Sequence, residues 1–283
     1  MNDLPDLLLE PLVRAALAED LAPWGDATSR AVIPPGTRGS VEIRSRMAGH
    51  VSGMQVAALA FRLIGPQVQI VTALPDGSPC QPGDALMTIT GDMAAILAAE
   101  RVALNFAGRM CGIATLTAAF VAQTTGSATR ITCTRKTTPG LRLLEKAAVR
   151  HGGGVNHRYG LGDAILIKDN HIAAAGGVAA VLTRVASARS HMMRVEIEVD
   201  TLEQLETVLA IGGADCVLLD NMTTPTLQQA VALVAGRMVT EASGNMTLPR
   251  IAEVAKTGVD FISVGALTHS APVLDVGLDY LKG

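Results

Sequence analysis

Short apolar runs that each close on a polar residue recur through the later part of the chain, and this repeat restricts the fold more than any other feature. Successive runs begin roughly 20–30 residues apart, which is the length of a β-α repeat. Helical patterns lie between them, as at residues 201–211 and 226–235. Alternating strands and helices predict a parallel sheet, either closed into a barrel or open and doubly wound. The runs are residues 131–133, 164–167, 195–198, 216–219, 238–240 and 261–264.

The polar residues at the ends of these runs favour the barrel. Functional groups of α/β barrels gather at the carboxyl ends of many different strands, and nearly every run here ends on such a group. Six runs are fewer than the eight strands of a regular barrel, which leaves room for an incomplete barrel.

The first part of the chain has the pattern of a mixed α/β unit. Apolar residues recur at helical spacing over residues 8–17. Residues 41–46 alternate between apolar and polar, as in a half-buried strand. Residues 68–90 have the pattern strand, turn, strand around a Pro/Gly turn. Asp92 is placed to cap a long following helix.

Composition and charge exclude several classes of protein. Hydrophobic residues make up 49% of the 283 residues and charged residues 17%, so the chain is able to form a sizeable core and is not intrinsically disordered. The net charge is −3 and aromatic residues are only 2%, which argues against nucleic-acid binding.

Cysteine spacing and the N-terminal sequence bear on the cellular compartment. The four cysteines show no C-x-x-C spacing, so they predict neither a zinc cage nor a disulfide framework and fit reduced thiols in the cytosol. The acidic N-terminal sequence lacks the basic segment of a signal peptide. The most apolar stretch, residues 110–122, is shorter than the roughly 20 residues that span a bilayer. We therefore expect a cytoplasmic protein without a membrane segment. The cysteines are Cys80, Cys111, Cys133 and Cys216.

Positive charge is concentrated in one stretch of the chain. Residues 130–171 hold eight Lys and Arg residues but only three Asp and Glu, a net charge of +5, together with three of the six histidines. One interpretation is a solvated basic face. Against it, Arg135, Lys136 and Lys168 lie at strand ends, where converging cations are destabilising without an anion. They predict a substrate with several carboxylates or phosphates, gripped by such pairs as Arg135-Lys136 and His157-Arg158.

The following strands carry acidic groups. Glu196 and Glu198 are two residues apart on one strand and therefore face the same side, and Asp220 ends the next strand. Carboxylates in this arrangement suit a hard cation such as Mg²⁺, which prefers one or two carboxylates plus phosphate oxygens. The alternative, considered chiefly for Glu196, is an internal salt bridge with Lys168 or Arg135.

The last two strands end in glycine-containing segments, residues 241–244 and 264–266. Late strands of barrels often present backbone N–H groups and a helix N-terminus to a phosphate, and glycine allows close approach. Ordinary turn formation is the alternative for each segment alone. His269 lies near this loop, where a capping or packing role is the more common one for a histidine.

Taken together, these motifs resemble the quinolinate phosphoribosyltransferase family. The resemblance covers nearly the whole chain, and it departs from the usual family pattern at Gly108, Cys111 and Asn245. It rests on the motifs at residues 19–20, 25–28, 100–105, 112–115, 134–142, 152–158, 166–171, 219–222, 241–244 and 262–270.

The resemblance implies a fold of two domains. An N-terminal α/β sandwich would cover residues 1–112, joined by a returning tail at 273–283, and an incomplete TIM-like α/β barrel would cover residues 113–272. It also implies a homodimer in which the N-terminal domain of one protomer covers the barrel mouth of the other, with Arg101 reaching into the neighbouring site.

The activity implied by the resemblance is transfer of phosphoribosyl from phosphoribosyl pyrophosphate to quinolinate with decarboxylation. The products would be nicotinate mononucleotide, CO₂ and pyrophosphate, in de novo NAD biosynthesis. Lys136, Lys168, Glu198 and Asp220 would be catalytic. The two carboxylates of quinolinate would be bound by Arg101, Arg135, His157, Arg158 and Lys168, and Lys136 would be shared with the diphosphate. Glu198 and Asp220 would bind the ribose hydroxyls and Mg²⁺. The remaining substrate-binding residues, most of them for the 5′-phosphate, would be Thr134, Ser243, Gly244, Asn245, Val264, Gly265, Ala266 and His269.

Three other functions remain open from the sequence. A nicotinate-specific phosphoribosyltransferase would need fewer cations than this chain provides. A molybdate-transport-associated paralogue is disfavoured by the intact motifs at residues 134–136, 157–158 and 168–171. A Schiff-base aldolase would use Lys168, a lysine at a strand end whose cationic neighbours would lower its pKa.

Overall fold

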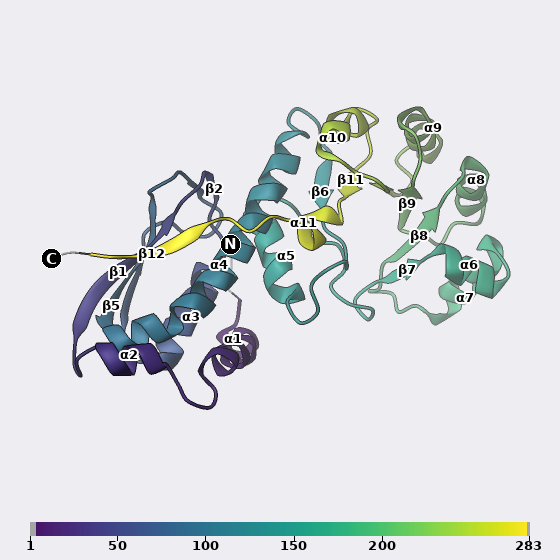
Figure 1. Ribbon diagram of the computed structural model, residues 1–283. Coiled ribbons are helices and arrows are strands. Elements are labelled where there is room, and N and C mark those ends of the chain that lie inside the picture. The colour runs from purple at the N-terminus through teal and green to yellow at the C-terminus, as the bar shows by residue number, and fades with distance from the viewer. Residues whose placement is uncertain (1–3, 282–283) are drawn as a thin grey trace. The chain divides into compact units, whose positions relative to one another are not determined.

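The computed structural model describes residues 4–281, which form two compact units (Figure 1). Of these residues, unit 1 comprises 4–118, 138–153 and 270–281, and unit 2 comprises 119–137 and 154–269. The chain therefore passes between the units four times. The sequence-based boundary at residues 112 and 113 falls inside one continuous helix, α4.

Unit 1 contains a four-stranded antiparallel sheet in the order β12-β1-β5-β3. The alternation predicted at residues 41–46 is confirmed in β1, where Val41, Ile43 and Ser45 are buried and the residues between them are not. The C-terminal strand pairs with β1, with Val41 opposite Tyr280, so the end of the described chain returns to this unit. The strands are β1 (Arg38–Ser45), β3 (Gln69–Thr72), β5 (Ala85–Asp92) and β12 (Val276–Tyr280), with a separate pair of β2 (Gly49–His50) and β4 (Pro79–Cys80).

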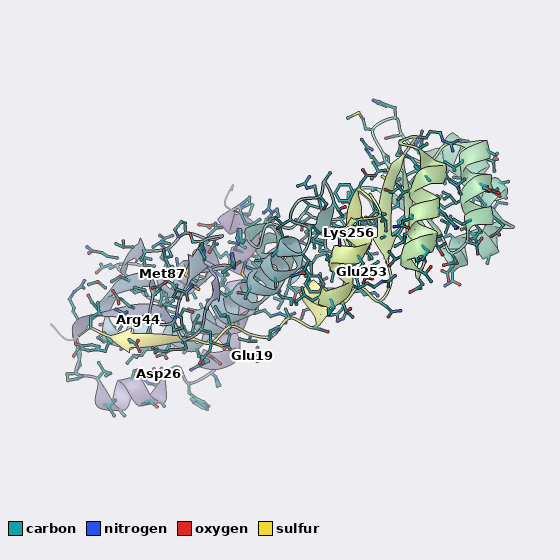
Figure 2. All side chains as sticks on the ribbon, turned by 90° about the horizontal axis from the view of Figure 1, so that it is seen from above. Glu19, Asp26, Arg44, Met87, Glu253 and Lys256 are labelled. Atoms are coloured by element: carbon teal, nitrogen blue, oxygen red, sulfur yellow. The ribbon has the colours of Figure 1, made fainter. Side chains whose placement is uncertain are left out.

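Unit 1 also contains helices, the last part of α4 continuing into unit 2. α3 buries an apolar face that includes Val56, Ala60 and Phe61. Figure 2 labels Arg44 and Met87, which lie on the neighbouring strands β1 and β5, and Met87 is fully buried. The helices are α1 (Asp6–Leu21), α2 (Ala27–Val32), α3 (Met54–Ile64), α4 (Met93–Ala122) and α5 (Arg142–His151).

The family departures on α4 lie against other parts of unit 1. A Cβ atom on Gly108 would lie 3.0 Å from the carbonyl oxygen of Leu274, so the C-terminal segment passes close to the helix there. Cys111 is fully buried and its thiol donates to the Ser52 carbonyl oxygen at 3.1 Å. Burial raises the pKa of the Cys111 thiol to about 12, so this cysteine acts as a small apolar residue.

Among residues 4–281, α4 is the single helix that is by itself long and apolar enough to cross a membrane. The helix runs well beyond the apolar stretch at residues 110–122 that the sequence analysis judged too short. In the structure 56% of its most apolar window is buried, and the core helix of a soluble protein passes the same test.

Unit 2 contains six parallel strands in the order β6-β11-β10-β9-β8-β7. The six predicted strands are all present, and the predicted helices at residues 201–211 and 226–235 correspond to α8 and α9. Within the described residues β6 and β7 do not pair with each other, so the sheet is an open, incomplete α/β barrel. The strands are β6 (Arg130–Thr132), β7 (Ile165–Ile167), β8 (Val195–Val199), β9 (Cys216–Asp220), β10 (Val239–Ser243) and β11 (Phe261–Ser263).

Several helices of unit 2 bury apolar residues, and two of them begin at threonine caps. The Thr201 and Thr223 hydroxyls each accept a backbone N–H and so start α8 and α9. On α10, Ile251 is buried, whereas Glu253 and the following Lys256, both labelled in Figure 2, are exposed. The helices are α6 (Asp169–Ala175), α7 (Val178–Ala188), α8 (Leu202–Ile211), α9 (Thr224–Val234), α10 (Leu248–Ala255) and α11 (Ala266–His269).

The crossing of α4 by the C-terminal segment requires a glycine. A Cβ atom at residue 112 would lie 1.8 Å from the carbonyl oxygen of Pro272, and only a backbone shift relieves that overlap. We expect Gly112→Ala to lower the free energy of unfolding by about 1–3 kcal/mol, the usual cost of overpacking. Denaturant titration measures this free energy of unfolding. The matched control is Gly162→Ala, whose added methyl meets nothing within 4 Å. Equal stability of the two variants contradicts the close approach.

Candidate functional site

The carboxyl ends of the six parallel strands surround a cavity of about 390 Å³, the carboxyl-end cavity. All six strands, or the residues directly after them, contribute to its wall, because parallel strands end at one edge of the sheet. Its lining residues are Thr134, Arg135, Lys136, His157, Arg158, Leu166, Lys168, Glu198, Leu218, Asp220, Glu241, Ser243 and Ser263. Most of the residues that the sequence analysis named as candidates thus lie around one space.

Two of the cations at this cavity have unused donors. The Nε atoms of Arg135 and Arg158 are buried and have no hydrogen-bond partner within the described structure. Arg158 donates from Nη1 to the Ala164 carbonyl oxygen at 2.9 Å, which fixes its guanidinium. Burial, and next the charge of Arg135, lower the pKa of Arg158. Buried charged donors without partners indicate that an anion belongs in this cavity.

Acidic groups line the same cavity. Lys168 Nζ lies 3.2 Å from Glu198 Oε2, and Asp220 stands at the end of the adjacent strand. Burial raises the pKa of Glu198, Lys168 offsets part of that rise, and Asp220 adds to it. Two carboxylates that repel each other at neighbouring strand ends form a suitable oxygen donor set for a divalent cation.

Glu196 does form an internal salt bridge, but its partner is neither Lys168 nor Arg135. Glu196 pairs with His157, whose Nε2 lies 2.7 Å from Oε2, and Lys168 pairs instead with Glu198. Glu241, 5% exposed, completes the group, with its Oε1 3.8 Å from the same imidazole nitrogen. His157, Glu196 and Glu241 are the set of three potential metal ligands that the described residues bring within 4.8 Å of one another.

The glycine-containing segments, residues 241–244 and 264–266, lie at the carboxyl ends of β10 and β11. A Cβ atom on Gly265 would lie 3.2 Å from both Lys136 Cδ and His269 Nε2, so these three predicted residues are neighbours. Val264 is buried and donates its backbone N–H to the Thr132 carbonyl oxygen, and Ala266 begins α11.

Gly244 and Asn245 both lie against Asn221. Gly244 has a φ of +92° and an added Cβ would overlap the Asn221 side chain. The Asn245 amide donates to Asn221 Oδ1 at 3.4 Å, and Asn221 in turn donates to Asp220 Oδ2 at 2.6 Å. Asn221 therefore orients Asp220, a contact that the sequence analysis did not anticipate, although Asn221 directly follows Asp220 in the chain.

Arg101 lies outside this group. It is an exposed residue of α4 in unit 1. Its predicted role toward a neighbouring protomer concerns a partner chain, and it stays a prediction.

Comparison with known proteins identifies the family. The model for the quinolinate phosphoribosyl transferase C-terminal domain matches residues 113–279, and that for the N-terminal domain matches residues 26–111. The chain belongs to the quinolinate phosphoribosyl transferase family.

Relatives align along almost their whole length. The nicotinate-nucleotide pyrophosphorylase [carboxylating] of Mycobacterium leprae is 43% identical over 272 residues, which cover 94% of this chain and 95% of the relative. A probable enzyme of the same name in Bacillus subtilis is 40% identical, covering 96% and 93%. The solved structure of NadC from Streptococcus pyogenes is 39% identical with a TM-score of 0.94 and covers 100% of both chains. Human nicotinic acid phosphoribosyltransferase, at 14% identity and a TM-score of 0.58, shares the fold alone.

The unused guanidinium donors predict tight binding of a small dicarboxylate. We expect phthalate to bind the wild-type protein and to lose about tenfold or more in affinity in Arg135→Ala and in Arg158→Ala, because a hydrogen bond to a charged group contributes about 1.5–3 kcal/mol. Calorimetric titration measures both affinities. Arg184→Ala, at an exposed position of α7, is the control. Unchanged affinity in the first two variants would show that the anion binds elsewhere.

Proposed function

We propose that this chain transfers the phosphoribosyl group of phosphoribosyl pyrophosphate to the ring nitrogen of quinolinate and removes one carboxylate as CO₂. Nicotinate mononucleotide and pyrophosphate are the other products. Support comes from the family and from relatives at 38–43% identity whose names are nicotinate-nucleotide pyrophosphorylase [carboxylating] or quinolinate phosphoribosyltransferase [decarboxylating]. The observation that carries the proposal is the pair of arginines, Arg135 and Arg158, whose buried Nε donors have no partner in the carboxyl-end cavity within the described structure.

The cationic wall binds quinolinate. Arg135, His157, Arg158 and Lys168 hold its two carboxylates, and Thr134 lines the same wall. Guanidinium groups suit this task because their planar donors match carboxylate oxygens. The ring nitrogen already has a lone pair, so the residues need to position it rather than deprotonate it.

The acidic wall binds the ribose of phosphoribosyl pyrophosphate. Glu198 and Asp220 accept hydrogen bonds from the ribose hydroxyls, and their charge stabilises the positive ribose that develops as pyrophosphate departs. The same two carboxylates would hold Mg²⁺, which neutralises charge on the leaving oxygens. Lys136, beside Gly265 and His269, supplies a further positive charge for the diphosphate.

The late strand ends bind the 5′-phosphate. Ser243 lines the cavity, and Gly244, Asn245 and the 264–266 segment follow at the same edge of the sheet. The absence of a side chain at Gly265 leaves room between Lys136 and His269. Backbone N–H groups and His269 donate to the phosphate oxygens.

Decarboxylation follows from the charge on the ring. Once the ring nitrogen is bonded to ribose it is positive, and it stabilises the electron pair left on the adjacent carbon as CO₂ departs. Arg135, His157, Arg158 and Lys168 keep that carboxylate in place while the bond breaks. A proton from water then bonds to the adjacent carbon and completes nicotinate mononucleotide.

We further propose the assembly and compartment. The active form is a homodimer in which Arg101 of one protomer reaches the quinolinate site of the other. The enzyme acts in the cytoplasm, with no nucleic-acid partner and no membrane segment.

Turnover of quinolinate tests the proposed activity. The wild-type protein with Mg²⁺ and phosphoribosyl pyrophosphate should release one CO₂ per nicotinate mononucleotide formed from quinolinate, and should not use nicotinate. Chromatography of the nucleotide together with trapping of labelled CO₂ measures both. Turnover of nicotinate, or mononucleotide without CO₂, contradicts the proposal.

Glu198 and Asp220 should determine the Mg²⁺ concentration that the reaction needs. We expect Glu198→Gln and Asp220→Asn each to lower kcat by about 10²–10³, the usual effect of removing one preorganised electrostatic group, and to raise the Mg²⁺ concentration needed for half-maximal rate. Asp200→Asn, at an exposed residue just after β8, is the matched control. An unchanged Mg²⁺ dependence in both site variants would place the metal on other ligands.

A further inference from the structure

A buried threonine to which the proposed function gives no role lies just after the last strand of the barrel. Thr268 belongs to the short helix α11, directly before His269, and it is 0% exposed. Its hydroxyl donates to the Lys136 carbonyl oxygen at 2.7 Å and lies 3.3 Å from the Gly265 carbonyl oxygen. The shorter contact joins two strand ends, since Lys136 follows β6 and Thr268 follows β11.

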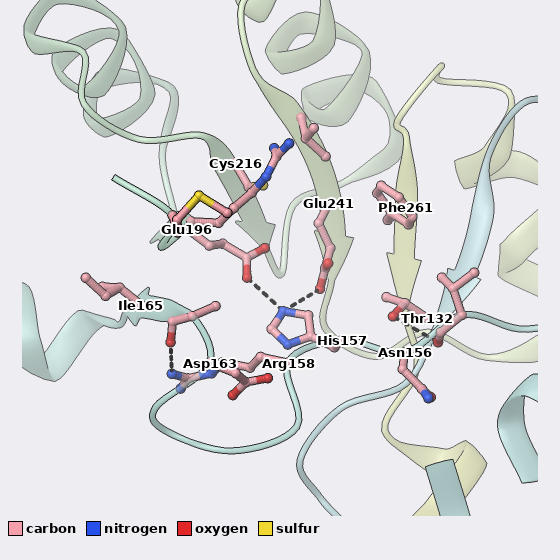
Figure 3. A pocket seen from close by; sticks show the side chains of 15 residues that line it. Thr132, Asn156, His157, Arg158, Asp163, Ile165, Glu196, Cys216, Glu241 and Phe261 are labelled. Atoms are coloured by element: carbon pink, nitrogen blue, oxygen red, sulfur yellow. Dashed lines mark hydrogen bonds and ion pairs between the residues drawn. The ribbon is translucent and has the colours of Figure 1, made fainter. Parts of the chain in front are cut away.

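The two strands concerned are parallel neighbours, with Thr132 of β6 opposite Ser263 of β11. Figure 3 labels Thr132 on β6 and Phe261 on β11, where both residues line a second cavity of about 430 Å³. The ladder continues past β11, because the Val264 N–H donates to the Thr132 carbonyl oxygen at 2.9 Å. Beyond that bond, the Thr268 hydroxyl joins the two segments that follow the strands.

The Gly265 carbonyl oxygen does not depend on this hydroxyl. It accepts the backbone N–H groups of Thr268 and His269, each at 3.2 Å. For the Lys136 carbonyl oxygen, the Thr268 hydroxyl is the donor found within the described structure. Removal of the hydroxyl would therefore leave the Lys136 carbonyl without this partner, whereas α11 would keep its backbone bonds.

Hydrogen bonds hold the Lys136 backbone on both sides. Its N–H donates to the Thr134 hydroxyl oxygen at 3.0 Å, and its carbonyl oxygen accepts from Thr268. Lys136 is exposed, so the direction of its side chain depends on its backbone more than on packing. An added Cβ on Gly265 would lie 3.2 Å from both Lys136 Cδ and His269 Nε2, so the lysine lies beside the segment predicted for the 5′-phosphate.

We propose that Thr268 is a positioning residue for phosphoribosyl pyrophosphate: its hydroxyl holds the Lys136 backbone so that Lys136 and His269 bind the diphosphate and the 5′-phosphate of one substrate molecule. The inference rests on the proposed function for its substrate. Thr268 acts through Lys136, because its own side chain is buried and donates to the lysine carbonyl. Arg135 is held separately, since its carbonyl oxygen accepts the Thr137 N–H at 2.9 Å.

Substitutions that differ in the hydroxyl group test this role. Thr268→Val keeps the shape of the side chain and removes the hydroxyl. Thr268→Ala and Thr268→Ser both lack the methyl group and differ only in the hydroxyl, so this pair decides the result if the valine variant does not fold. Thr257→Val is the matched control. Thr257 is also buried in unit 2 and donates to the Val254 carbonyl oxygen at 2.7 Å, and it is not part of the lining of the carboxyl-end cavity.

Steady-state kinetics measure the effect on each substrate. In Thr268→Val and Thr268→Ala we expect kcat/KM for phosphoribosyl pyrophosphate to fall about tenfold or more, because small misplacements of a positioned group have effects of this size. The KM for quinolinate should change by less than about twofold, since Arg135 keeps its own contacts. Thr268→Ser and Thr257→Val should resemble the wild type. Equal losses for both substrates, or a serine variant as impaired as the alanine variant, overturn the proposal.

A double-mutant cycle shows whether Thr268 acts through the lysine. In the background of Lys136→Ala, the Thr268→Val substitution should change kcat/KM by less than about twofold, because the backbone then positions no charged side chain. Additive losses would show that the hydroxyl acts independently of the lysine, and they would contradict the proposal.

Crystal structures of the variants without ligand separate this inference from the proposed function. We expect residues 134–137 to shift in Thr268→Val, and to stay in place in Thr268→Ser with its hydroxyl on the Lys136 carbonyl oxygen. An unshifted segment in Thr268→Val overturns the positioning role whatever the substrate is. Absence of quinolinate turnover in the wild type overturns the proposed function, whereas the crystal structures still decide whether Thr268 positions Lys136.

Discussion

Burial of positive charge at one edge of a parallel sheet is the constraint on which the rest of the site depends. Burial disfavours the charged form of Arg158, and both Arg135 and Arg158 keep buried Nε donors without partners in the carboxyl-end cavity, within the described structure. Such an arrangement is tolerated where a bound anion supplies the missing contacts. Ligand binding and stability of unit 2 are therefore coupled, since any anion that satisfies these donors also stabilises the folded state.

The strand order separates the two signs of charge. β6 and β7, which are followed by Arg135 and Lys168, form the two edges of the open sheet, whereas the carboxylates stand on β8, β9 and β10 between them. The segment that carries His157 and Arg158 joins these edges, because Val155 bridges to Thr132 of β6 and Arg158 bonds to the carbonyl of Ala164 just before β7. The cations therefore lie beside the gap in the barrel, and the carboxylates lie on the continuous part of the sheet.

Much of this could be predicted from residue patterns. Period-two alternation placed Glu196 and Glu198 on the interior side of β8, and polar strand ends located the cavity. The ion-pair partners could not be predicted, because residues two apart on a strand lie at depths that differ by about 6–7 Å. Glu198 therefore meets Lys168 at the carboxyl end, and Glu196 meets His157 deeper in the sheet. The return of the C-terminal tail to unit 1 agrees with the expected domain division, but the inclusion of residues 138–153 in that unit was not predicted, and α4 continues across the apparent change in periodicity at residue 112.

The buried Nε donors of Arg135 and Arg158 are expected to bind a dicarboxylate. A crystal structure of the protein with phthalate bound tests it most directly. We expect one diacid in the carboxyl-end cavity, with carboxylate oxygens within hydrogen-bond distance of Nε of both arginines. A diacid bound elsewhere, or a cavity diacid that leaves both Nε atoms without a partner, would contradict it.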